Sequence, residues 1–171
     1  FQQAGIQPDL ITLSKGLTGG FLPMGVTMAS ENIFSAFIGE EPRLTLWHGH
    51  SFTGNPLGCA AANASLDLLE KHPERFANFE LRHLSHLHTI AKHPKVKNVR
   101  VAGTIAAFDL KVDGPSGYLN LAGKSIKESA MKHGVFIRPL GNVVYLLPPL
   151  CLTDSQLEKC YLAIEKGLEE L

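Results

Sequence analysis

Glycine or proline interrupts each of the longest uncharged runs of this sequence. Two of them cover residues 16–30 and 139–153. A helix that crosses a bilayer needs about 20 consecutive apolar residues, so neither run predicts a membrane span. The chain opens at Phe1 without a basic segment before an apolar run, so we expect no secretory signal. This pattern favours short buried strands and loops in a soluble, cytoplasmic protein.

Composition narrows the class further. The chain has 171 residues, with 16 Lys plus Arg and 16 Asp plus Glu, so its formal net charge is zero. A neutral chain lacks the basic field that nucleic-acid binding requires. The three cysteines are too few and too scattered for a disulfide scaffold or a zinc cluster, and the histidines do not follow a metal-ligand pattern. We therefore expect a globular protein without a metal, a membrane or a nucleic acid as partner.

The first part of the chain predicts two short strands and two helices. Apolar runs over residues 10–13 and 25–29 indicate buried strands. Asn55 followed by Pro56 is a typical helix start, and we expect that helix to end before Pro73. Apolar side chains at helical spacing predict a second helix over residues 74–92.

The second part predicts the order β, α, β, β, α. Strands within residues 96–112 break at Gly103, a helix ends at His133, and strands over 135–138 and 143–147 form a pair. Thr153 and Gln156 form a capping box for the last helix. A shift in composition near residue 94 suggests two domains, 1–94 and 95–171.

Three stretches carry candidate chemistry. Lys15 directly follows a strand-like run, and a lysine there is costly to bury unless it is neutralised or used covalently, for example as a Schiff-base amine. An exposed surface lysine is an equal alternative. Residues 48–56 hold small and hydroxyl side chains before a helix start, which suits an anion site or simply a capped turn. Arg138, at a predicted strand end, is suited to bind a carboxylate, although a surface arginine is the commoner case.

Together these stretches resemble one family. Residues 9–20 (DLITLSKGLTGG) are similar to the cofactor-lysine segment of class III pyridoxal-phosphate aminotransferases, and residues 48–66 continue the resemblance in the same order. Residues 134–149 resemble the branch of that family that works in biotin biosynthesis. The resemblance implies an α/β protein of the PLP-dependent transferase fold type I. Residues 1–94 would then be the C-terminal part of the large domain with its connecting helices, and residues 95–171 the small C-terminal α+β domain.

The resemblance also implies a role for each matching residue. Lys15 corresponds to the lysine that bonds to pyridoxal 5'-phosphate and moves a proton at the substrate carbon. His50 and Ser51 correspond to the pair that meets the cofactor phosphate across a homodimer interface, where the family commonly has Pro-Thr. Gly49, Arg138 and Tyr145 correspond to substrate-binding positions, and Arg138 would hold a carboxylate.

The implied substrates are 8-amino-7-oxononanoate, as amino acceptor, and S-adenosylmethionine, as donor. An aspartate for the pyridine nitrogen, a stacking aromatic and a phosphate-binding Gly-Ser pair have no counterpart in these residues. We therefore expect the chain to be a C-terminal part of such an enzyme and to be inactive alone. Two alternatives stay open: another class III ω-aminotransferase, and a non-catalytic binding or assembly module with the same fold.

Overall fold

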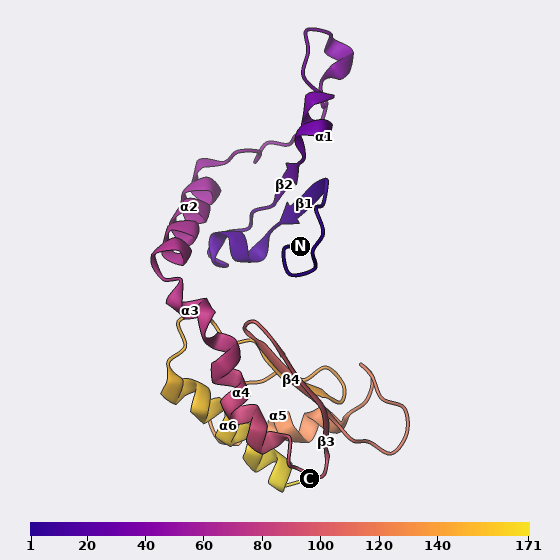
Figure 1. The fold of residues 1–171 in the computed structure, drawn as a ribbon, viewed down its shortest axis with the longest axis vertical. Helices are drawn as coiled ribbons and strands as arrows, with labels where there is room; N and C mark the ends of the chain where they lie inside the picture. The colour runs from indigo at the N-terminus through magenta and orange to yellow at the C-terminus, as the bar shows by residue number, and fades with distance from the viewer. The chain divides into compact units, whose positions relative to one another are not determined.

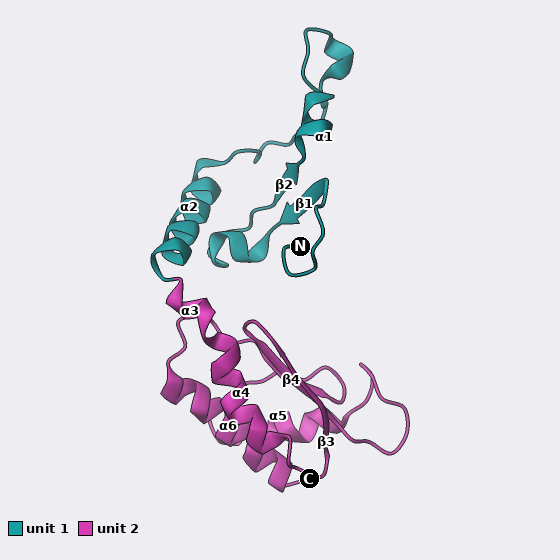
Figure 2. Ribbon diagram, in the orientation of Figure 1, with its two compact units in different colours: residues 1–72 teal, residues 73–171 magenta.

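The computed structural model describes residues 1–171 and divides into two compact units, Phe1–His72 and Pro73–Leu171 (Figure 2). The division falls directly before Pro73, which cannot donate a backbone hydrogen bond and ends the preceding helix. The boundary after residue 94 that the sequence suggests concerns the domains of the whole protein, and it stays a prediction. None of the helices combines the length and hydrophobicity that a membrane-spanning helix needs.

The first unit contains a two-stranded antiparallel sheet (Figure 1). Strand β1 (Leu10–Leu13) pairs with β2 (Val26–Ala29). The 3-10 helix η1 (Lys15–Thr18) follows β1, and the short elements α1 (Glu31–Ser35) and η2 (Pro42–Leu44) follow β2. The two strands predicted from the apolar runs are therefore confirmed.

The predicted burial of these strands is wrong. Leu10 is 55% exposed and Met28 is 51% exposed. Within this chain, β1 contacts β2 and η1 contacts α2. Apolar composition therefore gives the conformation of these strands but not their surroundings.

Helix α2 (Pro56–Lys71) begins and ends where the sequence predicts. The Asn55 side-chain oxygen accepts a hydrogen bond from the Gly58 N–H at 2.7 Å, and Pro56 occupies the first helical position. The asparagine supplies an acceptor for a free N–H group at the helix start, and the proline that follows has no N–H group that would need an acceptor.

The second unit is a three-stranded antiparallel sheet with helices packed on it (Figure 1). The strands β3 (Val96–Ala102), β4 (Ile105–Leu110) and β5 (Val143–Leu146) are adjacent in that order. The helices are α3 (Glu74–Ala77), α4 (Phe79–Ile90), α5 (Ala122–Lys132) and α6 (Asp154–Glu169). Helix α4 contacts β3, β4 and α6, while α5 contacts α6 and β5. The core between them includes Leu87, Phe108, Ile126, Tyr161 and Ile164.

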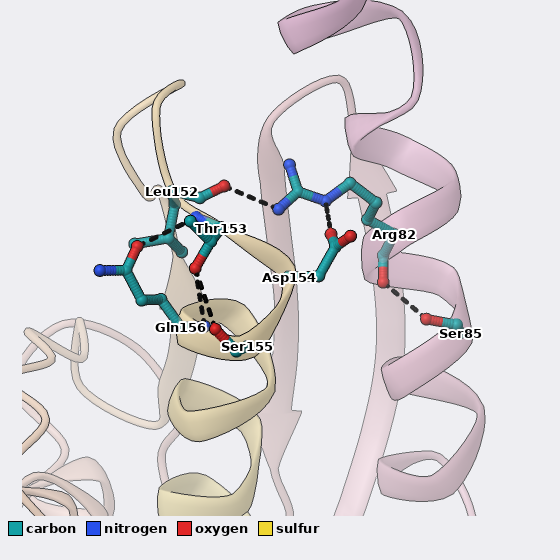
Figure 3. Close-up of polar contacts among 7 residues, drawn as sticks. All are labelled: Arg82, Ser85, Leu152, Thr153, Asp154, Ser155 and Gln156. Atoms are coloured by element: carbon teal, nitrogen blue, oxygen red, sulfur yellow. Dashed lines mark hydrogen bonds and ion pairs between the residues drawn. The ribbon is translucent and has the colours of Figure 1, made fainter.

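Polar contacts join the start of α6 to α4 (Figure 3). Arg82 on α4 donates a hydrogen bond from Nη2 to the Leu152 carbonyl at 2.8 Å, and its Nε lies 2.6 Å from Asp154 Oδ1. The predicted capping box is confirmed, because Thr153 Oγ1 accepts from the Gln156 N–H and Gln156 Oε1 accepts from the Thr153 N–H.

Two predicted elements differ from the structure. The helix expected over residues 74–92 is divided at Asn78 into α3 and α4. The strand expected over residues 135–138 is wrong: Val135 and Ile137 are buried and their neighbours are exposed, but no strand pairs with them. The alternation of burial there imitates a strand, whereas β5 pairs with β4 and, through a single bridge, with Leu140.

Strand β3 lies at an edge of the sheet and is irregular. Its register with β4 shifts between Lys97 and Arg100, and Asn98 has a left-handed φ of 51°. Asn98 Nδ2 and Arg100 Nη1 both donate to the Asp109 carboxylate, at 2.9 and 2.8 Å. Burial raises the pKa of Asp109, but these two hydrogen bonds and the Arg100 charge outweigh it and hold that pKa below its ordinary value.

Candidate functional site

Lys15 has an unusual backbone. It opens η1, separated from the end of β1 by one residue, and its φ of 27° lies in the region that glycine favours. Only Asn98 shares this property among the non-glycine residues. Such a conformation costs about 1–3 kcal/mol and is typical of residues held in position at functional sites. The Lys15 side chain is exposed, and its amine has no partner.

The turn after Lys15 is held by its own hydrogen bonds. The Gly20 N–H donates to the Lys15 carbonyl at 3.2 Å, and the buried Thr18 hydroxyl donates to the Leu22 carbonyl at 2.6 Å. Gly19 and Gly20 have φ values of 63° and 79°. The two glycines therefore form a tight turn, which fixes the backbone that carries the lysine.

Gly49, His50 and Ser51 lie in the loop before α2. The His50 N–H donates to Thr53 Oγ1 at 3.1 Å, and His50 Nδ1 accepts from the Phe52 N–H at 3.2 Å. These bonds hold the loop, while the exposed Ser51 hydroxyl has no partner. His50 lines a cavity of about 460 Å³ together with residues 23–25 and 52–55. Sequence reasoning did not single out Thr53, although a hydroxyl three residues after a loop residue is a recognisable turn signal.

In the second unit, Arg138 and Tyr145 line the same cavity of about 330 Å³. The structure thus brings together two predicted site residues from separate segments. The other lining residues are mostly apolar: Val135, Phe136, Ile137, Leu146, Leu147, Pro148, Pro149, Leu152 and Cys160. Arg138 is exposed and makes no hydrogen bond or ion pair, so its guanidinium is available to an anion. The other predicted site residues, Lys15, Gly49, His50 and Ser51, belong to the first unit.

Asn142, between the Arg138 segment and β5, supports the segment that carries Arg138. It is 2% exposed, its Oδ1 accepts from the Gly117 N–H at 2.8 Å, and its Nδ2 donates to the Leu110 carbonyl at 3.1 Å. The adjacent Gly141 has a φ of 63°, and a Cβ there would overlap the Gly117 carbonyl. Asn142 therefore fixes the turn that follows Arg138.

Comparison with known proteins assigns the family. The pattern described as Aminotransferase class-III matches residues 1–168. The chain belongs to the class III aminotransferases. One relative is the Synechococcus elongatus protein named adenosylmethionine-8-amino-7-oxononanoate aminotransferase. It is 52% identical to this chain over 170 residues, which cover 99% of this chain and 40% of that protein. The protein of the same name from Geobacter sulfurreducens is 39% identical over 96% of this chain and 38% of its own length.

Solved structures agree with this class III assignment. The crystal structure of adenosylmethionine-8-amino-7-oxononanoate aminotransferase from Methanocaldococcus jannaschii matches with a TM-score of 0.87 at 33% identity, over 96% of this chain and 39% of that one. An amine transaminase from an uncultivated Pseudomonas species, in its PLP-bound form, matches with a TM-score of 0.86 at 31% identity, over 99% and 40%. The chain is thus a mixed α/β part of the class III architecture, and it spans about 40% of the length of these relatives.

Proposed function

We propose that this chain is part of a PLP-dependent transaminase of biotin biosynthesis, which converts 8-amino-7-oxononanoate to 7,8-diaminononanoate with S-adenosylmethionine as amino donor. The proposal includes fold type I, with the end of the large domain followed by the small C-terminal domain, and a homodimer as the working form. It also includes a cytoplasmic location, which the three free cysteines support.

The observation that carries the proposal is the cavity shared by Arg138 and Tyr145. The acceptor substrate has a long hydrocarbon chain that ends in a carboxylate. The apolar walls of the cavity suit the chain, and the unpaired guanidinium of Arg138 suits the carboxylate. The relatives named for this reaction, at 52% and 39% identity, support the same substrate.

The residues of the first unit fit pyridoxal phosphate. Lys15 offers a primary amine without a partner, on a strained and hydrogen-bonded turn. Ser51 offers a free hydroxyl beside His50, in the loop that precedes the α2 N-terminus. An amine for covalent attachment and hydroxyl and imidazole groups for a phosphate are the donor set that this cofactor needs.

Each residue then has a chemical role. When bound, the cofactor supplies an electron sink for the substrate carbon. Lys15 would take the proton from that carbon as a general base and would give it up again as a general acid. The Ser51 hydroxyl would donate to the cofactor phosphate across the proposed homodimer interface, with His50 beside it. Arg138 binds the substrate carboxylate, Tyr145 lines its hydrocarbon chain, and the Gly49 backbone contacts the substrate.

The first test is turnover by the full-length protein. We expect amino transfer from S-adenosylmethionine to 8-amino-7-oxononanoate, measured by formation of 7,8-diaminononanoate. Arg138→Ala should raise the KM for the oxononanoate by at least tenfold, because loss of a charge-assisted pair costs about 1.5–3 kcal/mol. Arg75→Ala, an exposed arginine on α3, is the matched control and should leave that KM unchanged.

A second test isolates the lysine. The full-length protein should bind pyridoxal phosphate with an absorbance that persists on dialysis, and borohydride should fix the cofactor to Lys15 in a peptide map. Lys15→Ala should lose both signals. If the wild-type protein shows neither signal, the proposal fails, and the non-catalytic module becomes the better reading.

Another class III ω-aminotransferase is the second candidate. Thermostable omega transaminases match this chain with a TM-score of 0.88 at 27% identity, so the fold alone does not separate the two activities. Turnover of simple ω-amines at rates well above that with the oxononanoate pair would favour this candidate.

A further inference from the structure

Arg138 borders a second cavity besides the one that it shares with Tyr145. This cavity has a volume of about 320 Å³, and Lys124 and Lys127 of α5 line it together with Arg138. The other lining residues are uncharged: Tyr118, Asn120, Leu121, Gly123, Pro139, Leu140 and Gly141. Three cations therefore surround one cavity in a chain whose formal net charge is zero. Such a concentration of positive charge attracts an anion.

The backbone explains why the three cations meet. Burial alternates along residues 135–138: Val135 and Ile137 are buried, whereas Phe136 and Arg138 are exposed. Lys127 Nζ lies 5.4 Å from the centre of the Phe136 ring, in a cation–π contact. The aromatic ring thus holds the Lys127 ammonium on the face that carries the Arg138 guanidinium.

The two lysines differ in their charge balance. Lys124 Nζ has the Glu128 carboxylate 3.8 Å away, one helical turn along α5, which partly neutralises it. Lys127 has no carboxylate three or four residues away on its helix and makes no ion pair. Lys127 is therefore the cation that adds most to the field around Arg138.

We propose that Lys127 is a second residue, besides Arg138, that attracts the substrate carboxylate. The cavity lined by Lys124, Lys127 and Arg138 is then the subsite for this anion. The inference rests on the proposed function for the identity of the substrate. Arg138 makes the direct paired contact, while Lys127 strengthens the field that selects a carboxylate over an uncharged group of the same shape. Lys127 is thus a specificity residue whose effect depends on the charge of the ligand.

The test measures binding, so that it does not depend on turnover. The full-length protein is titrated with nonanoate, an unreactive nine-carbon carboxylate, and with nonanamide, its uncharged counterpart. Lys127→Met should weaken nonanoate binding about threefold, as expected for one partly exposed charge, and leave nonanamide binding unchanged. Lys127→Arg should restore nonanoate binding. The difference between wild type and Lys127→Met should shrink as salt is raised.

Lys132→Met is the matched control. Lys132 lies on the same helix but pairs with Glu170 at 3.9 Å, and its removal should not change the nonanoate Kd. Equal nonanoate affinity in wild type and Lys127→Met, or an equal loss for nonanamide, overturns the proposal. So does the absence of nonanoate binding by wild type. Failure of the proposed reaction would appear separately, as absent turnover in a protein that still discriminates nonanoate from nonanamide.

Discussion

His83 Nδ1 lies 2.7 Å from the Tyr161 hydroxyl oxygen, and both side chains are buried in the second unit, at 0% and 2% exposure. The bond joins α4 to α6. His83 Nε2 lies 3.0 Å from the Thr104 carbonyl oxygen, which only accepts, so Nε2 carries a proton. We assign the neutral tautomer in which Nδ1 accepts from Tyr161, because a second proton on the ring would remove that acceptor.

This pair predicts that the protein loses stability in mild acid. Burial lowers the pKa of His83, assisted by the nearby Arg82 and His86, although the hydrogen bond to Thr104 opposes this shift. The unfolded chain therefore takes up a proton below about pH 6.5, where the folded chain does not. Stability is complete above that pH and falls as the pH drops toward the folded-state pKa, by up to about 1.4 kcal/mol per pH unit.

Thermal unfolding between pH 5 and 7.5 measures this effect above the range in which carboxylates titrate. His83→Gln should flatten the pH dependence of Tm, while the exposed His88→Gln on the same helix should keep it. Parallel Tm curves for wild type and His83→Gln would contradict the assignment.

Arg82 joins α4 to the start of α6, so its loss should lower the stability of the fold (Figure 3). Besides its contacts with Leu152 and Asp154, its guanidinium lies 4.5 Å from the centre of the Phe79 ring. Arg82→Met should lower the free energy of urea unfolding by about 1–3 kcal/mol, because a hydrogen bond from a charged donor is lost. Arg75→Met should change it by less than about 0.5 kcal/mol, as a surface substitution does.

Substitution of Gly141 should lower the unfolding free energy by more than its left-handed backbone alone would cause. Gly141→Ala adds a Cβ that overlaps the Gly117 carbonyl, whereas Gly103→Ala, at a similar φ of 57°, meets nothing within 4 Å. We expect Gly103→Ala to cost about 1 kcal/mol in unfolding free energy and Gly141→Ala clearly more. Gly141→Ala should also weaken carboxylate binding by Arg138, because the turn after Arg138 must move. Similar costs for the two variants would argue against this role of the turn.

Replacing Lys15 with glycine should relieve the strain of its left-handed backbone but abolish activity. Lys15→Ala keeps the left-handed backbone that costs an L residue about 1–2 kcal/mol, whereas Lys15→Gly removes that cost. After allowance for the greater freedom of glycine in the unfolded chain, Lys15→Gly should be more stable than Lys15→Ala by about 0.5–1 kcal/mol. Both variants should be inactive. Denaturation of the cofactor-free, full-length proteins provides the comparison, and a less stable glycine variant would disprove it.

Helices and strands could largely be predicted from the sequence, because their signals are local. Asn55 before Pro56 and Thr153 before Gln156 mark helix starts through bonds made within a few residues. The failure at residues 135–138 has the opposite cause: strand formation needs a partner strand, and burial alternation does not reveal whether one exists. The exposure of β1 likewise depends on which layers cover it.

The same distinction holds for the candidate site. Lys15, Arg138 and the loop before α2 were found from residue types and their order along the chain. The shared cavity of Arg138 and Tyr145 agrees with the role proposed for them. Asn142 and Lys127 were not found, because their importance comes from contacts with Gly117, Leu110 and Phe136, which lie apart from them in the sequence.

The irregular edge of the small sheet bears on solubility during folding. An exposed regular edge strand offers free N–H and C=O groups to strands of other molecules, which is a common route to aggregation. The register shift in β3, the left-handed Asn98, and the charged Lys97 and Arg100 make this edge a poor template for such pairing. Of the two outer strands of the three-stranded sheet, β3 is therefore unsuited to intermolecular growth.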